Sequence, residues 1–138
     1  ILVAIILLIF LGFSLNKQPE ENIKSSEVEN FINAILSYTT ECRDERNFEF
    51  LPIRKIIIDC SQGLSCYDGK NTCDVLEEDL KQITEKSWDL TRYSGYEMRL
   101  IKQNKTLIPI IKAGNSSVNS KGYLEEVEDI EIIFKAYY

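Results

Sequence analysis

The sequence predicts an α+β fold, in which a long N-terminal helix, first apolar and then amphipathic, precedes a small head with two helices and a three-stranded antiparallel sheet. Three observations predict it. Residues 1–15 carry no charge. Apolar residues recur at three- and four-residue spacing in two later segments, 23–36 and 75–88, which is the period of a helix. The last third of the chain alternates apolar and polar residues, which is the period of a strand.

The apolar run 1–15 must be buried, because leaving it in water forfeits about 25 cal/mol for each Å² of apolar area. It lacks the basic n-region and the small-residue cleavage pattern of a secretory signal peptide. As a helix it reaches about 23 Å, which is less than the roughly 30 Å of hydrocarbon that a transmembrane span crosses. We therefore favour a third interpretation, a chain processed at its N-terminus. Its apolar helix first anchors it in a membrane and then packs against identical helices in an assembly.

The segment after the apolar run changes character at Pro19, where the missing backbone donor predicts a kink or break. Beyond it, an apolar stripe at helical spacing predicts an amphipathic helix that continues the first one and packs on a folded head. The chain then divides into an apolar helix over residues 1–18, an amphipathic helix over 19–38 and a head over 39–138. The stripe consists of Ile23, Val28, Phe31, Ile32, Ile35 and Leu36.

Two shorter helices are expected at the start of the head. Residues 39–50 are charged and predict a loop. Pro52 suits the first position of a helix that runs to about Cys60, although the isoleucine run within it also suits a strand. The segment 74–88 predicts a second helix with an acidic first turn, and Trp88 is expected to fill the core between this helix and the sheet.

The three predicted strands form a meander at the end of the chain. Residues 96–102 and 106–112 predict a hairpin, and Pro109 places the second strand at an edge or at a bulge. A Ser- and Asn-rich loop is expected over 114–122, followed by a long final strand over 127–138. One face of this sheet is apolar and needs the helices as a cover.

Composition excludes several classes of function. The chain has 138 residues and a net charge of −6, and it lacks the clustered Lys and Arg that nucleic-acid binding requires. It contains no histidine, which removes the commonest general base and metal ligand together with every Ser-His or Cys-His nucleophile pair. No EF-hand loop and no glycine-rich phosphate loop is present. We therefore expect a protein that is not an enzyme and that uses no cofactor or metal.

The four cysteines are Cys42, Cys60, Cys66 and Cys73. An even number of cysteines behind an export or anchor segment predicts disulfides, while their spacing lacks the close C-x₂₋₄-C pairs that favour the rival zinc site. Three pairings are possible. A bridge from Cys60 to Cys73 would join the two helices flanking the loop and leave Cys66 to pair with Cys42. Each bridge is expected to contribute about 2 to 4 kcal/mol.

Two N-glycosylation motifs lie in segments that read as turns. Asn104-Lys105-Thr106 and Asn115-Ser116-Ser117 each fit the sequon, so Asn104 and Asn115 are candidate glycan acceptors if the head is exported. The cysteines and the sequons together predict an extracellular, cell-surface location.

The layout of an apolar helix, an amphipathic continuation and a small head resembles the archaeal type IV pilin-like proteins, which are exported with class III signal peptides. The resemblance lies in architecture rather than in a diagnostic motif, and Ile5 stands where type IV pilins commonly carry a Glu. It implies that the N-terminal helix anchors the subunit in the membrane and later forms the core of a surface filament. The partners are then identical subunits, the membrane before assembly, and surface or cell receptors, but not nucleic acid.

The leading functional hypothesis is thus a structural subunit of an extracellular type IV pilus-like filament, with the head outside. The alternative is a single-pass anchored extracytoplasmic binding or sensor domain. Gly12 would let neighbouring helices approach closely. The residues expected in the filament core or membrane are Ile1, Leu2, Val3, Ile5, Ile6, Leu8, Ile9, Leu11, Gly12 and Phe13.

Overall fold

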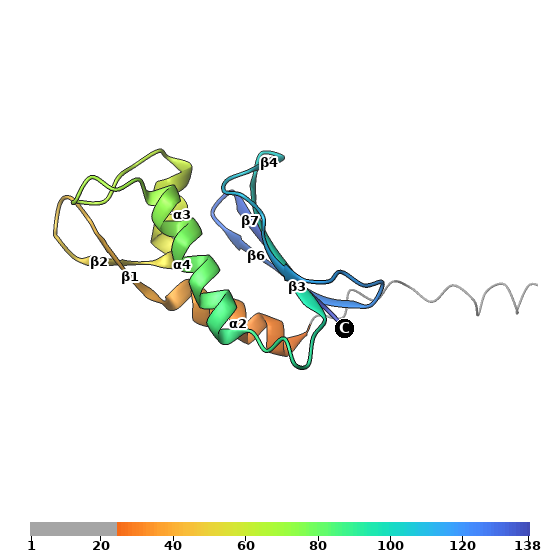
Figure 1. Cartoon of the computed structure of the whole chain (residues 1–138). Helices are drawn as coiled ribbons and strands as arrows, with labels where there is room; N and C mark the ends of the chain where they lie inside the picture. The colour runs from red at the N-terminus through yellow and green to blue at the C-terminus, as the bar shows by residue number, and fades with distance from the viewer. Residues whose placement is uncertain (1–24) are drawn as a thin grey trace, which may run out of the picture.

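The computed structural model describes residues 25–138, which form three helices and seven strands. The helices lie against one face of the larger sheet and leave its other face open (Figure 1). In chain order the elements are α2 (Ser26–Ser37), β1 (Thr39–Arg43), β2 (Phe50–Pro52), α3 (Ile53–Ser61), α4 (Thr72–Ser87), β3 (Gly95–Lys102), β4 (Lys105–Thr106), β5 (Ile111–Gly114), β6 (Ser120–Val127) and β7 (Ile130–Tyr137).

Helix α2 begins at Ser26 because Ser25 caps it. The backbone of Ser25 is extended, with φ −80° and ψ 115°, and its side-chain oxygen accepts a hydrogen bond from the amide of Val28. A residue with an extended backbone is not part of a helix, so α2 cannot continue on the N-terminal side of Ser25. The prediction of one long helix running from the apolar segment through residue 38 is therefore wrong. Residues 1–24, with the predicted kink at Pro19, lie outside the described part of the chain.

Helix α2 packs on the head through one face, as the apolar stripe predicts. Val28, Ile32, Ile35 and Leu36 are all buried, and the helix contacts α3, β6 and β7. Its first turn is also tied to the loop after α4, because Glu27 accepts a hydrogen bond of 2.7 Å from the Tyr93 hydroxyl. Helix α2 is therefore an integral part of the head.

The predicted three-stranded sheet is wrong. The larger sheet has five antiparallel strands in the order β4-β3-β7-β6, and β5 also pairs with β3. The predicted strand 106–112 splits into β4 and β5 around Pro109, which cannot donate to a ladder. The predicted loop 114–122 runs into β6, which ends at Val127. The chain then turns through Glu128, whose φ of 56° is left-handed, into β7.

Residues 39–50, predicted as a loop, contain the separate two-stranded sheet of β1 and β2. Thr39 pairs with Pro52 and Arg43 with Phe50. Only Thr40 and Cys42 of β1 are buried, and of these only Cys42 is apolar. The other side chains of the strand are polar, which is why its sequence is typical of a loop. This hairpin leads directly into α3, whose N-cap is Pro52.

The core lies between the helices and the inner face of β3 and β7. Trp88, which follows the last residue of α4, fits between α2 and the sheet, with ring centroids 4.8 Å from Phe31 and 4.9 Å from Phe134. The interpretation of Trp88 as a core residue is confirmed. The inward residues of the two central strands are Tyr96, Met98, Leu100, Ile130, Ile132, Phe134 and Ala136.

Candidate functional site

The end of the head that lies farthest from the C-terminus is built by two loops (Figure 1). One is the turn of the β1–β2 hairpin with its flanking residues, 43–50, and the other is the cysteine-bearing loop over residues 62–70. We call these two segments the distal tip. They are joined directly, because the amide of Tyr67 donates a hydrogen bond of 2.9 Å to the carbonyl oxygen of Arg43.

Two disulfides fix the distal tip to the rest of the head. Cys42 of β1 is bonded to Cys66, and Cys60 of α3 is bonded to Cys73 of α4. The first ties the hairpin to the cysteine-bearing loop, and the second joins the helices on either side of that loop. The disulfide prediction is confirmed, with all four cysteines paired, and no thiolate is left for the rival zinc site.

A polar pocket of about 470 Å³ opens at the distal tip. It is bounded by the hairpin turn, by the exposed side of α3 and by the start of the cysteine-bearing loop. Its volume falls within the range of small-ligand sites, about 300 to 1,000 Å³. The lining residues are Asp44, Glu45, Arg46, Leu51, Lys55, Asp59, Gln62, Leu64 and Ser65.

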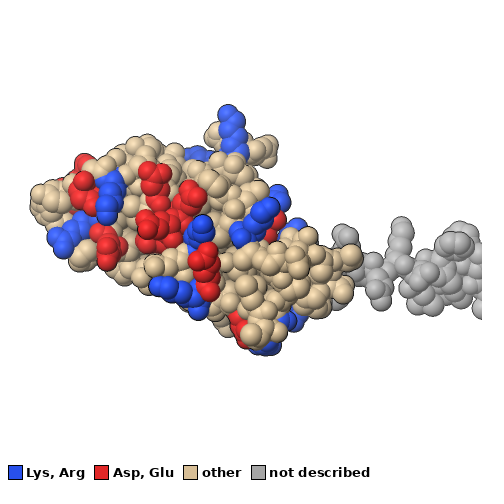
Figure 2. Space-filling model, viewed as in Figure 1, with Lys and Arg blue, Asp and Glu red and all other residues tan. Residues whose placement is uncertain are grey.

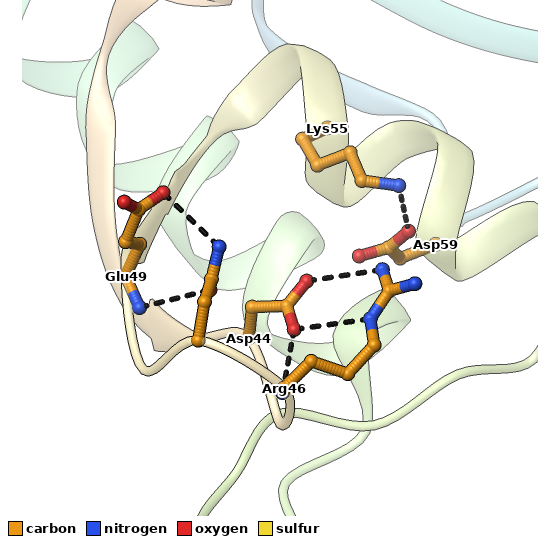
Figure 3. Close-up of polar contacts among 6 residues, drawn as sticks. Asp44, Arg46, Glu49, Lys55 and Asp59 are labelled. Carbon is orange, nitrogen blue, oxygen red and sulfur yellow. Dashed lines mark hydrogen bonds and ion pairs between the residues drawn. The ribbon is translucent and has the colours of Figure 1, made fainter.

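Four of the five charged groups that line this pocket occur as two ion pairs (Figure 3). Lys55 Nζ lies 2.8 Å from Asp59 Oδ1, and the Asp59 side chain is only 8% exposed. Arg46 Nη2 lies 3.3 Å from Asp44 Oδ2, while the amide of Arg46 donates 2.7 Å to Asp44 Oδ1. That amide and then the guanidinium lower the pKa of Asp44 below its usual value. Both carboxylates are thus held by a cationic partner, and the lowered pKa keeps Asp44 ionised at neutral pH.

Two aromatic side chains project from the same two loops. The rings of Phe48 and Tyr67 meet edge to face with centroids 4.7 Å apart, yet their residues are 53% and 57% exposed. The amide of Phe48 donates 3.0 Å to the carbonyl oxygen of Asp44, so the ring stands on the turn that also lines the pocket. The tip therefore combines an exposed aromatic pair with a fixed set of polar groups.

A second pocket, of about 250 Å³, lies between β1, the cysteine-bearing loop and α4. Figure 2 shows acidic side chains gathered over α4. One of its lining carboxylates, Asp79, has a buried oxygen, Oδ2, with no hydrogen-bond partner. Burial, and then the charges of Glu78 and Glu41, raise the pKa of Asp79 above its ordinary value.

The raised pKa of Asp79 predicts that its charge destabilises the head at neutral pH. The folded state holds the proton more tightly than the unfolded state, so stability falls as pH rises from the unfolded pKa through the folded pKa. We expect Asp79→Asn to raise the melting temperature by a few degrees at pH 7 and to give little gain at pH 3. Glu85→Gln, which neutralises an exposed carboxylate of the same helix, is the matched control and should change the melting temperature little, as exposed substitutions generally do. An equal gain at both pH values would contradict the interpretation.

Both sequons lie on the surface. Asn104 is in the turn between β3 and β4 with φ 61°, and Asn115 directly follows β5; both side chains are exposed. Glycan occupancy stays a prediction. The predicted filament-core residues lie outside the described part of the chain.

The tip was not predicted as a site. The feature of the sequence that could have indicated it is a set of aromatic residues, Phe48, Phe50 and Tyr67, in loops that are otherwise charged or rich in glycine. A loop with no role beyond connecting two elements would carry polar residues at these positions. Residues 51–61 separate the two loops in sequence, and the disulfide, the Tyr67 amide and the contact between the two rings bring them together.

Within residues 25–138, no group of three or more His, Cys, Asp or Glu side chains is arranged to hold a metal ion. Over the same residues, no helix has both the length and the hydropathy of a membrane span. Comparison with known proteins found no match to a family model, to a curated protein or to a solved structure.

Proposed function

We propose that the protein is a structural subunit of an extracellular type IV pilus-like filament, which assembles through its apolar N-terminal segment and carries the head outside. The observation that carries this proposal is the packing of α2. Its apolar face is buried in the head, and Glu27 bonds its first turn to Tyr93. The uncharged run 1–15 is therefore connected to a helix built into the head, rather than to a detached tail.

The length of the connection supports the proposal. Residues 16–24 separate the apolar run from Ser25, and nine residues span at most about 30 Å even when fully extended. Each head must then stay close to the site where its own apolar run is buried. Apolar runs that gather to avoid water would consequently bring their heads into a tight layer around them.

Two further features fit an extracellular head. Disulfides persist in oxidising compartments, and this head has two of them within a short stretch of chain. Both sequons are exposed in turns, where a glycan would meet no packed neighbour. The proposed filament role requires no catalytic group.

The alternative, a single-pass anchored binding domain, is favoured by one specific observation. The polar pocket at the distal tip has the size of a small-ligand site and fixed polar groups. An anchored receptor would present such a tip away from the membrane. The two functions differ in whether the apolar run holds copies together.

Deletion of residues 1–18 separates the two functions. For a filament subunit, the full chain should form elongated polymers that sediment, and the truncated chain should remain monomeric with both disulfides formed. For an anchored domain, the full chain should stay in discrete particles in detergent or vesicles. The measurements are sedimentation and negative-stain electron microscopy, with disulfide mapping to verify the head. Polymers formed by the truncated chain, or a full chain that never polymerises, would contradict the filament proposal.

A further inference from the structure

The exposed aromatic pair at the distal tip has no role in the core or in the proposed assembly. Phe48 has a φ of 59°, in the left-handed region that bulky side chains avoid. The other residues with positive φ in the described chain are Gly, Gln, Asn or Glu. A Gly or Asn at position 48 would adopt this turn more easily and would expose no ring. The edge-to-face contact with Tyr67 contributes only a modest stabilisation and is set against the backbone strain, so it does not explain why both rings stay about half exposed, whereas a contact with a ligand does.

The pocket beside the aromatic pair is polar but close to neutral. Arg46 and Lys55 face the carboxylates of Asp44 and Asp59 as internal pairs, and Glu45 adds one further negative charge. An anionic ligand would meet three carboxylates against two cations, so the net charge of the pocket disfavours it. The free capacity lies in the remaining carboxylate lone pairs, in the unused N–H groups of Arg46 and Lys55, in the Gln62 amide and in the Ser65 hydroxyl. These groups suit a ligand with many uncharged hydroxyl groups.

We propose that the distal tip binds a neutral oligosaccharide. The apolar C–H face of one sugar ring stacks on Phe48, whose ring Tyr67 supports edge to face, and the hydroxyl groups of the chain bond to the polar groups of the pocket that the same turn lines. The disulfide Cys42–Cys66 holds the two loops in this arrangement before the ligand arrives, which reduces the entropy lost on binding. The proposal depends on the tip alone, so it applies equally to a filament subunit and to an anchored domain.

The test uses the full chain in a detergent without a sugar headgroup, applied to an array of immobilised glycans. The neutral probes are maltose, lactose, mannobiose and diacetylchitobiose, together with longer oligomers of each. Oligosaccharides that contain glucuronate or an amine serve as the charged comparison probes. An apolar peptide serves as the comparison probe for protein binding. We expect binding to at least one neutral series and weaker binding to its glucuronate-containing analogues, and the amine-bearing analogues test whether the net negative charge of the pocket selects a cation instead.

Phe48→Asn is the decisive variant, because asparagine tolerates the left-handed backbone and removes only the ring. It should leave the melting temperature nearly unchanged, because relief of the backbone strain offsets the lost contact with Tyr67, and it should weaken neutral-glycan binding about tenfold, the scale of one lost aromatic contact. Tyr67→Ser should weaken binding similarly. Tyr138→Ala, at an exposed tyrosine on the opposite end of the head, is the matched control and should bind as the wild type does.

The proposal is overturned if no neutral glycan binds, if a charged glycan binds as tightly as its neutral analogue, or if only the apolar peptide binds. It is also overturned if binding survives both tip variants. Because the array measures the tip and the sedimentation assay measures the N-terminal segment, failure here leaves the filament proposal standing, and the reverse also holds.

Discussion

Replacing both Cys42 and Cys66 by alanine should lower the free energy of unfolding by about 3.5 kcal/mol. The bridge closes a separation of 24 residues, and the chain-entropy relation gives about this value for a loop of that length. Such a loss is a large fraction of the 5 to 15 kcal/mol that typically separates a folded domain from its unfolded state. The variant should therefore unfold at a much lower urea concentration than the wild type.

The same replacement should also remove glycan binding, because it releases the hairpin from the cysteine-bearing loop. Cys60→Ala with Cys73→Ala is the matched control. That bridge spans 13 residues, so its removal should cost about 3 kcal/mol, but the contact between the two loops of the tip should remain. The Cys42/Cys66 variant should thus lose both folding stability and glycan binding. The Cys60/Cys73 variant should lose mainly folding stability.

Trp88 provides the measurement, since it is the single tryptophan of the chain and is buried between α2 and the sheet. Urea denaturation of each variant, followed by its fluorescence, gives the free energy of unfolding. An unchanged midpoint in the Cys42/Cys66 variant would contradict the role assigned to this bridge. Equal glycan binding by the two variants would contradict its effect on the tip.

The helices of the head were predictable from sequence because their apolar periodicity is strong. The predicted segment 74–88 corresponds to α4, and the stripe from Val28 to Leu36 corresponds to the buried face of α2. The boundary at Ser25 was missed although serine is a favoured N-cap residue, because continuity of the apolar pattern suggested one uninterrupted rod. The N-cap residue sets the start of the helix even where the apolar pattern extends beyond it, because its side chain bonds to the first free amide groups of the helix.

The sheet was less predictable because its outer strands are polar. In β6, Val127 is the only fully buried residue, and Gly122 and three charged side chains interrupt the alternation. In β1, burial of Thr40 and Cys42 leaves no apolar series to detect. Strands of this kind form because they pair with a neighbouring strand, and that pairing leaves no pattern in the strand's own sequence. The central strands β3 and β7, which bury alternate apolar residues, were recognisable.

The candidate site depends on tertiary contacts that sequence does not contain. The cysteines predicted disulfides, yet three pairings remained open, and only the observed one joins the hairpin to the cysteine-bearing loop. Without that pairing, Phe48 and Tyr67 are two unrelated aromatic residues, nineteen positions apart in the sequence. The pocket similarly combines one ion pair of the hairpin turn with another on the face of α3.

Ile9→Lys should abolish filaments, and it is the change with the largest expected effect on assembly. Ile9 lies in the middle of the uncharged run. A lysine at the centre of an apolar helix costs about 3 kcal/mol on insertion scales. In a polymer this cost falls on every subunit, so even a moderate value shifts the equilibrium far toward unassembled chains. The head should be unaffected, because the fold of residues 25–138 is complete in its own core.

The most direct test of the central claim is negative-stain electron microscopy of three full-length chains: wild type, Ile9→Lys and Val118→Lys. Val118 is fully exposed on the head, so its replacement introduces the same side chain without burying a charge. The filament proposal predicts long filaments from the wild type and from Val118→Lys, and none from Ile9→Lys, with both disulfides formed in all three. Filaments of normal length and number from Ile9→Lys, or no filaments from the wild type, would contradict it.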